Sequence, residues 1–151
     1  MTGDKAEQLI REMHDRALIR DLLMRYGRAI DRRDIDAVAA CFTSDAEYEG
    51  SLGKGKIARM LDALRKVMPR YEKTMHLLGT QAIELTGNVA RCETYGIVYQ
   101  RLRDPVTPRD RVVGVCYVDE LACRERGWLI TKRLARIDWR RQDDKAPPLA
   151  S

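Results

Sequence analysis

Hydrophobic positions change their spacing near residue 70. Before that point they recur every three or four residues, and the helix predicted over residues 15–31 carries a stripe at 18, 22, 26, 29 and 30, with 19 and 23 beside it. A short helical pattern over residues 34–42 begins at Asp34, whose carboxylate can cap it, and another over residues 55–69 ends at Pro69. The first half of the chain therefore predicts three helices.

Beyond residue 70 the apolar positions alternate, as in strands with one buried face. The alternation over residues 75–87 predicts that His76, Leu78 and Ala82 lie on one side. Further strands are expected over residues 46–50, 89–102, 111–126 and 127–140. Helices followed by long strands indicate an α+β fold, in which a curved antiparallel sheet packs against about three N-terminal helices and encloses a cone. We expect one domain over residues 1–151.

Composition places the chain among soluble proteins, with 44% hydrophobic and 34% charged residues. It has no apolar run near the ~20 residues that span a bilayer, and its N-terminus lacks the apolar core of a secretory signal. We therefore expect a cytoplasmic protein that does not enter a membrane. The four cysteines have neither CxxC nor zinc-ligand spacing, so we expect reduced core thiols and no metal site.

A formal net charge of +5 raises the question of nucleic-acid binding. Acids alternate with the bases along most of the chain, and only residues 132–141 concentrate positive charge, which favours a solvated surface and no nucleic-acid partner. The stretch Gly50–Ile57 has the glycine and lysine spacing of a phosphate-binding loop. Ile57 stands where such a loop needs a hydroxyl for magnesium, so we expect a turn leading into the third helix.

The chain has two histidines, and His76 is the candidate for chemistry because it starts an apolar face, whereas His14 has charged neighbours. Asp31 is its candidate partner. A carboxylate gains nothing at a helix C-terminus, where the macrodipole is negative, so another group is expected to compensate it. Hydrogen bonding to one ring nitrogen of His76 would leave the other nitrogen as a general base. The alternatives are a core histidine and a surface acid.

Residues 19–50, 74–99 and 127–139 resemble the SnoaL-like branch of the NTF2-like superfamily. This branch includes scytalone dehydratase, bile-acid dehydratase, hexachlorocyclohexane dehydrochlorinase and polyketide cyclases. The likeness covers nearly all of residues 10–140 and implies the cone fold. It also places Asp31 and His76 on the catalytic pair of the family.

The same resemblance extends to three further side chains. It places Tyr26 and Tyr48 at positions where relatives carry catalytic or pocket groups, and Arg133 on the strand arginine of the family. Arg136 competes for that last position, but three residues of separation put the two arginines on opposite faces of a strand, and Arg133 shares its face with smaller, less charged neighbours. We therefore expect Arg133 inside the cone.

Together these features predict a cofactor-independent enzyme of the lyase or isomerase type, with Asp31, His76, Tyr26 and Arg133 as catalytic residues. Dehydration, double-bond isomerisation and cyclisation stay open, because each can begin with the same proton abstraction. A hydrophobic or polycyclic substrate is expected against walls that include Tyr48, Leu22, Leu78, Val98, Val113 and Val115.

The alternative is a non-catalytic NTF2-like module that holds a ligand or dimerises. In either case we expect self-association, as a dimer or trimer, through an outward set made of Tyr95, Ile97 and Tyr99, because one patch of this kind is too apolar to face water.

Overall fold

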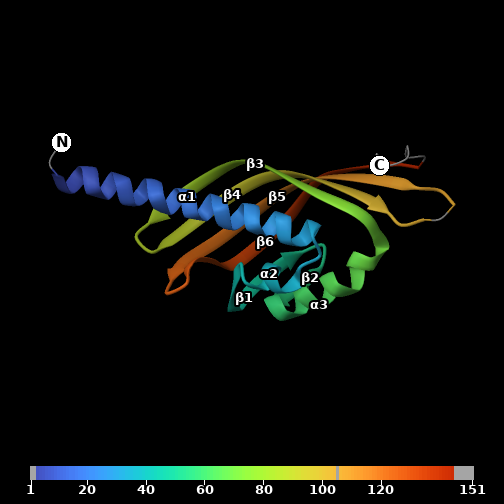
Figure 1. Cartoon of the computed structure of the whole chain (residues 1–151), viewed down its shortest axis with the longest axis horizontal. Helices are drawn as coiled ribbons and strands as arrows, with labels where there is room; N and C mark the ends of the chain where they lie inside the picture. The colour runs from blue at the N-terminus through green and yellow to red at the C-terminus, as the bar shows by residue number, and fades with distance from the viewer. Residues whose placement is uncertain (1–2, 105, 145–151) are drawn as a thin grey trace.

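A computed structural model describes residues 3–104 and 106–144 of the chain (Figure 1). Within these residues the helices are α1 (Gly3–Asp31), α2 (Ile35–Ala39) and α3 (Ile57–Val67), the last followed by the 3-10 turn η1 (Met68–Arg70). The strands are β1 (Phe42–Gly50), β2 (Gly53–Lys56), β3 (Tyr71–Thr86), β4 (Val89–Leu102), β5 (Arg109–Arg124) and β6 (Gly127–Asp143). The predicted α+β order of elements is confirmed, and the Asp34 side chain caps α2 by accepting from the Ala37 N–H.

The described strands form one curved sheet in the order β2-β1-β6-β5-β4-β3. All neighbours are antiparallel except β1 and β6, which run parallel, so the expectation of a wholly antiparallel sheet is wrong at this pair. The cause is that β1 enters the sheet after α2 and not through a hairpin with β6. The expected turn before α3 is also wrong in part, because Gly53–Lys56 pairs back on β1 as an edge strand.

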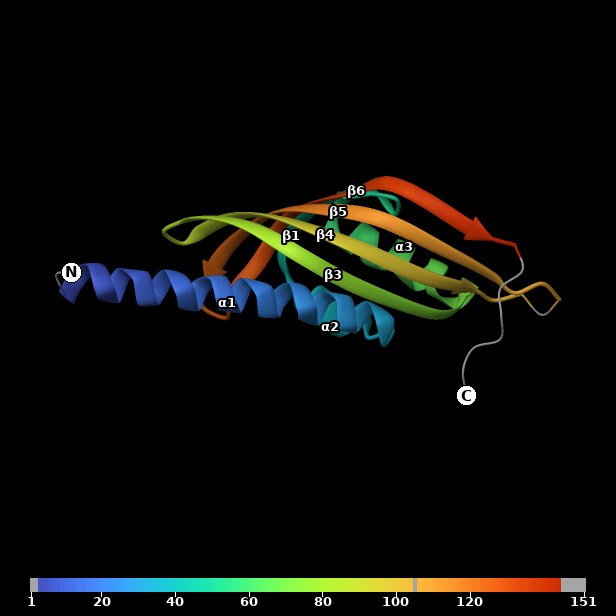
Figure 2. The same cartoon turned by 90° about the horizontal axis from the view of Figure 1, so that it is seen from above.

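Helix α1 lies along the concave side of the sheet and extends beyond it at its N-terminal end (Figures 1 and 2). Its 29 residues make a rod about 44 Å long. Buried side chains occur only in the C-terminal half of α1, which packs on the sheet and begins at Ile19. Leu18 is 37% exposed, although the sequence places it on the apolar stripe. The true core stripe consists of Ile19, Leu22, Leu23, Tyr26, Ala29 and Ile30.

Strand β3 changes face in its middle. Thr74, His76 and Leu78 are half-buried on the concave side, and the register with β4 shifts between Leu78 and Gln81. After this bulge Ile83 is buried and Ala82 is exposed, so the prediction that Ala82 shares a face with His76 is wrong. Strict alternation cannot continue through an extra residue in one strand.

The convex side of the sheet is left uncovered by the helices (Figure 2). Tyr95 and Ile97 are 54% and 44% exposed there, whereas Val98 on the opposite face is buried, so the predicted parity of β4 holds. Cys41, Cys92 and Cys116 are buried, Cys123 is half-buried, and all are free thiols. No helix within the described residues is long and apolar enough to cross a membrane.

Candidate active site

A close approach of α1 to β3 builds the centre of the site. A Cβ atom placed on Gly27 would lie 3.4 Å from both the His76 Cβ and the Leu78 Cδ1, so a larger side chain here would press on the strand. Asp31 follows Gly27 by four residues and therefore lies on the same side of the helix, one turn further on. The glycine thus lets the helix end within hydrogen-bond reach of His76.

Asp31 accepts three hydrogen bonds from β3. The Oδ1 atom lies 2.7 Å from the His76 Nδ1 and accepts from the Thr74 hydroxyl at 2.9 Å, and Oδ2 accepts from the His76 backbone N–H at 2.8 Å. Partial burial alone would raise the pKa of Asp31, but these hydrogen bonds outweigh it and the pKa is lowered. Because an ionised carboxylate only accepts, Nδ1 is the ring nitrogen that donates to Asp31, and in a neutral ring Nε2 is then the nitrogen with the lone pair.

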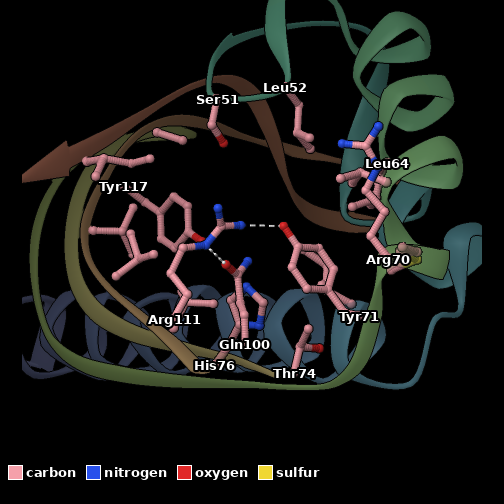
Figure 3. A pocket seen from close by; sticks show the side chains of 18 of the residues that line it. Ser51, Leu52, Leu64, Arg70, Tyr71, Thr74, His76, Gln100, Arg111 and Tyr117 are labelled. Carbon is pink, nitrogen blue, oxygen red and sulfur yellow. Dashed lines mark hydrogen bonds between the residues drawn. The ribbon is translucent and has the colours of Figure 1, made fainter. Parts of the chain in front are cut away.

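The concave face of the sheet, closed by α1 and α3, encloses a cavity of about 360 Å³ (Figure 3). His76 lines it, while Asp31 stands behind the ring and does not. The other lining groups from the middle of the sheet are Val98, Gln100, Arg111, Val113, Val115, Tyr117, Ala135, Ile137 and Arg140, and Tyr71 and Thr74 from β3 complete this wall. Apolar side chains and a histidine that can accept a proton therefore face the same space.

The structure separates the other predicted catalytic and wall residues into two groups. Tyr26, Tyr48, Val98, Val113 and Val115 line the cavity together with His76. Leu22 and Leu78 do not line it, so their expected place in the wall is wrong, and Arg133, which was expected as a catalytic residue, does not line it either. Leu22 is fully buried one turn before Tyr26, where α1 packs directly on the sheet, and Leu78 packs under Gly27.

Arg133 is inside the fold, as expected, and Arg136 is outside, where it pairs with Asp138. Arg133 donates from Nε and Nη2 to the two carboxylate oxygens of Asp119, each at 2.7 Å, and both side chains are fully buried. Its guanidinium carbon also lies 4.0 Å from the ring centre of Tyr26 and 4.4 Å from that of Tyr117. The charge of Arg133 is therefore engaged behind the tyrosines, and a direct contact with substrate is not available to it.

Three tyrosines around this arginine keep their hydroxyl protons at neutral pH. Burial raises the pKa of Tyr48 to about 12, raises that of Tyr26, and raises that of Tyr117 well above its ordinary value. The nearby Arg133 charge lowers the pKa of each, but less than burial raises it. Tyr26, Tyr48 and Tyr117 thus face the cavity as neutral hydroxyls that can donate hydrogen bonds.

Sequence reasoning missed Arg111, Gln100 and Tyr71. The Arg111 Nε donates to the Gln100 side-chain oxygen at 2.7 Å, and its Nη2 donates to the Tyr71 hydroxyl (Figure 3). A signal was present, because Arg111 shares the parity of Val113 and Val115, which were assigned to the interior. Within the described ranges, no group of three histidine, cysteine or acidic side chains is placed to hold a metal ion.

The model of the SnoaL-like domain matches residues 11–134. The chain belongs to the SnoaL-like family. An uncharacterised protein of Mycobacterium tuberculosis is 27% identical over 137 residues, which are 87% of this chain and 90% of that protein. The matched segment contains Asp31, His76 and Arg133, so the resemblance noted in the sequence is confirmed at the level of the family.

Solved structures confirm the NTF2-like cone. A hexachlorocyclohexane dehydrochlorinase from Novosphingobium barchaimii superimposes with a TM-score of 0.78 at 20% identity, covering 92% of this chain and 99% of that one. A scytalone dehydratase-like protein from Novosphingobium aromaticivorans gives a TM-score of 0.76 at 17% identity, covering 96% and 95%. At these identities the likeness is one of fold.

Proposed function

We propose that the protein is a cofactor-independent enzyme of the lyase or isomerase type that uses Asp31 and His76 as a general-base pair. The observation that carries this proposal is the 2.7 Å contact between the Asp31 Oδ1 and the His76 Nδ1, with the histidine ring lining a cavity. Family membership supports the same class of reaction, since dehydratases and dehydrochlorinases share this fold. A filled cone or a distant aspartate would instead have favoured a binding module.

In the proposed reaction, the His76 Nε2 removes a proton from a carbon that is activated by a carbonyl or faces a leaving group. Asp31 holds the ring in the tautomer with Nδ1 protonated and stabilises the imidazolium that forms. Tyr26 or Tyr48 donates a hydrogen bond to the carbonyl or to the departing hydroxyl. Arg133 acts only through the tyrosines that it touches, which replaces the direct role first expected for it.

The substrate is proposed to be small and largely hydrophobic. Val98, Val113, Val115 and Ile137 supply apolar surface in a cavity of about 360 Å³, which is at the lower end of the range for drug-sized ligands. Loss of water, movement of a double bond and ring closure each follow from the same carbanion or enolate. The first step is therefore the one to measure.

Deuterium exchange tests that step without knowledge of the natural product. The protein is incubated in D₂O with a panel of aryl and alicyclic ketones, some neutral, such as 1-tetralone and β-hydroxy ketones, and some bearing a carboxylate, and proton NMR follows the hydrogens next to the carbonyl. We expect exchange or elimination faster than in buffer for at least one compound, and loss of that activity in His76→Ala. His14→Ala is the matched control, because His14 is an exposed histidine on α1. Buffer-level rates across the panel would contradict the proposal.

Self-association through the convex face is proposed alongside this activity. Leu77, Tyr95, Ile97 and Trp139 are between 44% and 62% exposed there and border one shallow hollow. Water contact with so much apolar surface is unfavourable, and a second copy would remove it. Light scattering at tens of micromolar is expected to give more than one subunit for the wild type and a monomer for Ile97→Glu. A monomeric wild type would contradict it.

A further inference from the structure

The charges around the cavity are of one sign. Four arginines line it, namely Arg33, Arg70, Arg111 and Arg140, and no aspartate or glutamate is among the lining residues that the structure describes. Asp31, the carboxylate next to the site, lies behind His76 and is already engaged by three hydrogen bonds. The cavity therefore attracts anions.

Arg111 differs from the other three because it is half-buried and held in place. It extends from β5 opposite Gln100 of β4, with which it is paired in register. Gln100 and the Tyr71 hydroxyl accept its hydrogen bonds, and its guanidinium carbon lies 5.7 Å from the Tyr71 ring centre. Both acceptors are neutral. Arg33, Arg70 and Arg140 are exposed.

The two fully buried arginines have carboxylate partners, and Arg16, which is half-buried like Arg111 but lies outside the cavity lining, donates to the Ile83 carbonyl. Arg133 is paired with Asp119, and Arg101 with Asp110. No carboxylate of residues 3–104 or 106–144 forms an ion pair with Arg111. A guanidinium that neutral acceptors alone hold at a cavity wall keeps its positive charge available to an anion in that cavity.

We propose that the substrate carries an anionic oxygen group, a carboxylate or a phosphate, and that Arg111 and Tyr71 bind it. The guanidinium offers its remaining N–H groups, and the Tyr71 hydroxyl, which accepts from Arg111, still has its own proton to donate. The apolar body of the molecule then lies against Val98, Val113 and Ile137. The substrate is thus an amphiphilic anion, not a neutral hydrocarbon.

The strand register fixes how far this group stands from the reacting carbon. His76 pairs with Val98, and Gln100, two residues along β4, pairs with Arg111. His76 and Arg111 stand on the two strands that flank β4, about 9.4–9.8 Å apart across the sheet, and they are offset by two residues, about 6.6–6.8 Å, along it. This step rests on the proposed function. The anionic group then lies several bonds away from the C–H that His76 attacks. Arg111 therefore positions the substrate and does not contact the enolate.

Calorimetric binding tests the charge preference separately from catalysis. The probes are 2-naphthoate, 2-naphthyl phosphate and the neutral 2-naphthamide, titrated into wild type, Arg111→Met, Tyr71→Phe and Arg136→Met. Arg136 is the matched control because it is an exposed arginine on the convex face. Thermal unfolding of each variant verifies that it is folded.

We expect at least one anion to bind wild type about 10- to 100-fold more tightly than the amide, as for hydrogen bonds to charged groups, and Arg111→Met to abolish that preference. Tyr71→Phe should weaken the anion by a smaller factor, and Arg136→Met should leave it unchanged. Whichever of the two anions binds more tightly identifies the preferred group as a carboxylate or a phosphate.

Equal binding of amide and anions, a preference that survives Arg111→Met, or no binding of either anion would overturn the inference. Measuring the same probes on His76→Ala separates it from the proposed function. If His76→Ala still prefers anions and the wild type shows no deuterium exchange, the proposed substrate class is supported and only the catalytic role is contradicted.

Discussion

Two acid–base pairs lie between the helix and the sheet, and they differ in what each leaves available. Asp119 and Arg133 are both fully buried, and each end of the carboxylate receives one guanidinium nitrogen. Asp31 and His76 keep 23% and 7% of their side-chain surface exposed, and Asp31 contacts one of the two ring nitrogens of His76. Neither member of the first pair lines the cavity, whereas the ring of His76 does, with the nitrogen that Asp31 does not engage.

This difference assigns separate roles to the two pairs. In the buried pair, each charge is neutralised by its partner, and the pair holds β5, β6 and the tyrosine cluster in place. Removing it should therefore lower the free energy of unfolding. The Asp31–His76 pair has one ring nitrogen at the cavity wall, so replacing either residue should lower the turnover rate. Variants that exchange these two outcomes would break the distinction.

The largest effect on stability is expected for Asp119→Ala. It leaves the Arg133 guanidinium buried without its counter-charge, which costs about 3–5 kcal/mol in the free energy of unfolding. Chemical denaturation monitored by circular dichroism measures that loss. Replacing both partners, as Asp119→Leu with Arg133→Met, should recover most of it, because no unpaired charge remains. A stable single variant would contradict a structural role for the pair.

The next effect is smaller and depends on pH. The lowered pKa of Asp31 means that its ionised form stabilises the fold above the ordinary value of 3.8, and that this contribution is lost as the pH falls through the lowered value. Asp31→Asn removes the titrating group. The stability gap between wild type and variant should therefore be widest near neutral pH and close in acid.

Urea denaturation at pH 7 and pH 3 checks this dependence, with Asp21→Asn as the control because Asp21 is an exposed acid on the same helix. A gap that stays constant, or one that widens in acid, would show that the hydrogen bonds from β3 do not favour the ionised Asp31.

The smallest effect is expected on the convex side of β6. Arg136 and Asp138 form a pair there with side chains 51% and 35% exposed. Water competes for such pairs, so Arg136→Ala should leave the denaturation midpoint unchanged. A loss comparable to that of Asp119→Ala would mean that ion pairing alone, and not burial, distinguishes the two sites.

Much of the fold could be predicted because its signals are local. The helical spacing before residue 70, the cap at Asp34 and the alternation of β4 each depend on neighbours in the sequence. The meeting of Asp31 with His76 was also within reach, since an acid at a helix C-terminus needs a compensating group and the family resemblance named one.

The remaining features depend on tertiary contacts that spacing does not encode. The bulge after Leu78 reverses the face of β3, and the parallel pairing of β1 with β6 follows from how the chain enters the sheet. Arg133 was expected to serve the substrate because Asp119, its partner on the neighbouring strand, was not considered. Arg111 was overlooked because a single arginine among valines resembles a surface charge until the register places it inside.

The most direct test of the catalytic pair is a double-mutant cycle on deuterium exchange, with the ketone that the wild type turns over fastest. Asn at position 31 can donate to the His76 Nδ1, which moves the ring proton to Nε2 and removes the base. We predict that Asp31→Asn and His76→Ala each lower the rate by about 10²–10⁴, and that the double variant is no slower than the slower single variant. Losses that multiply, or single variants with the wild-type rate, would contradict a joint role for Asp31 and His76.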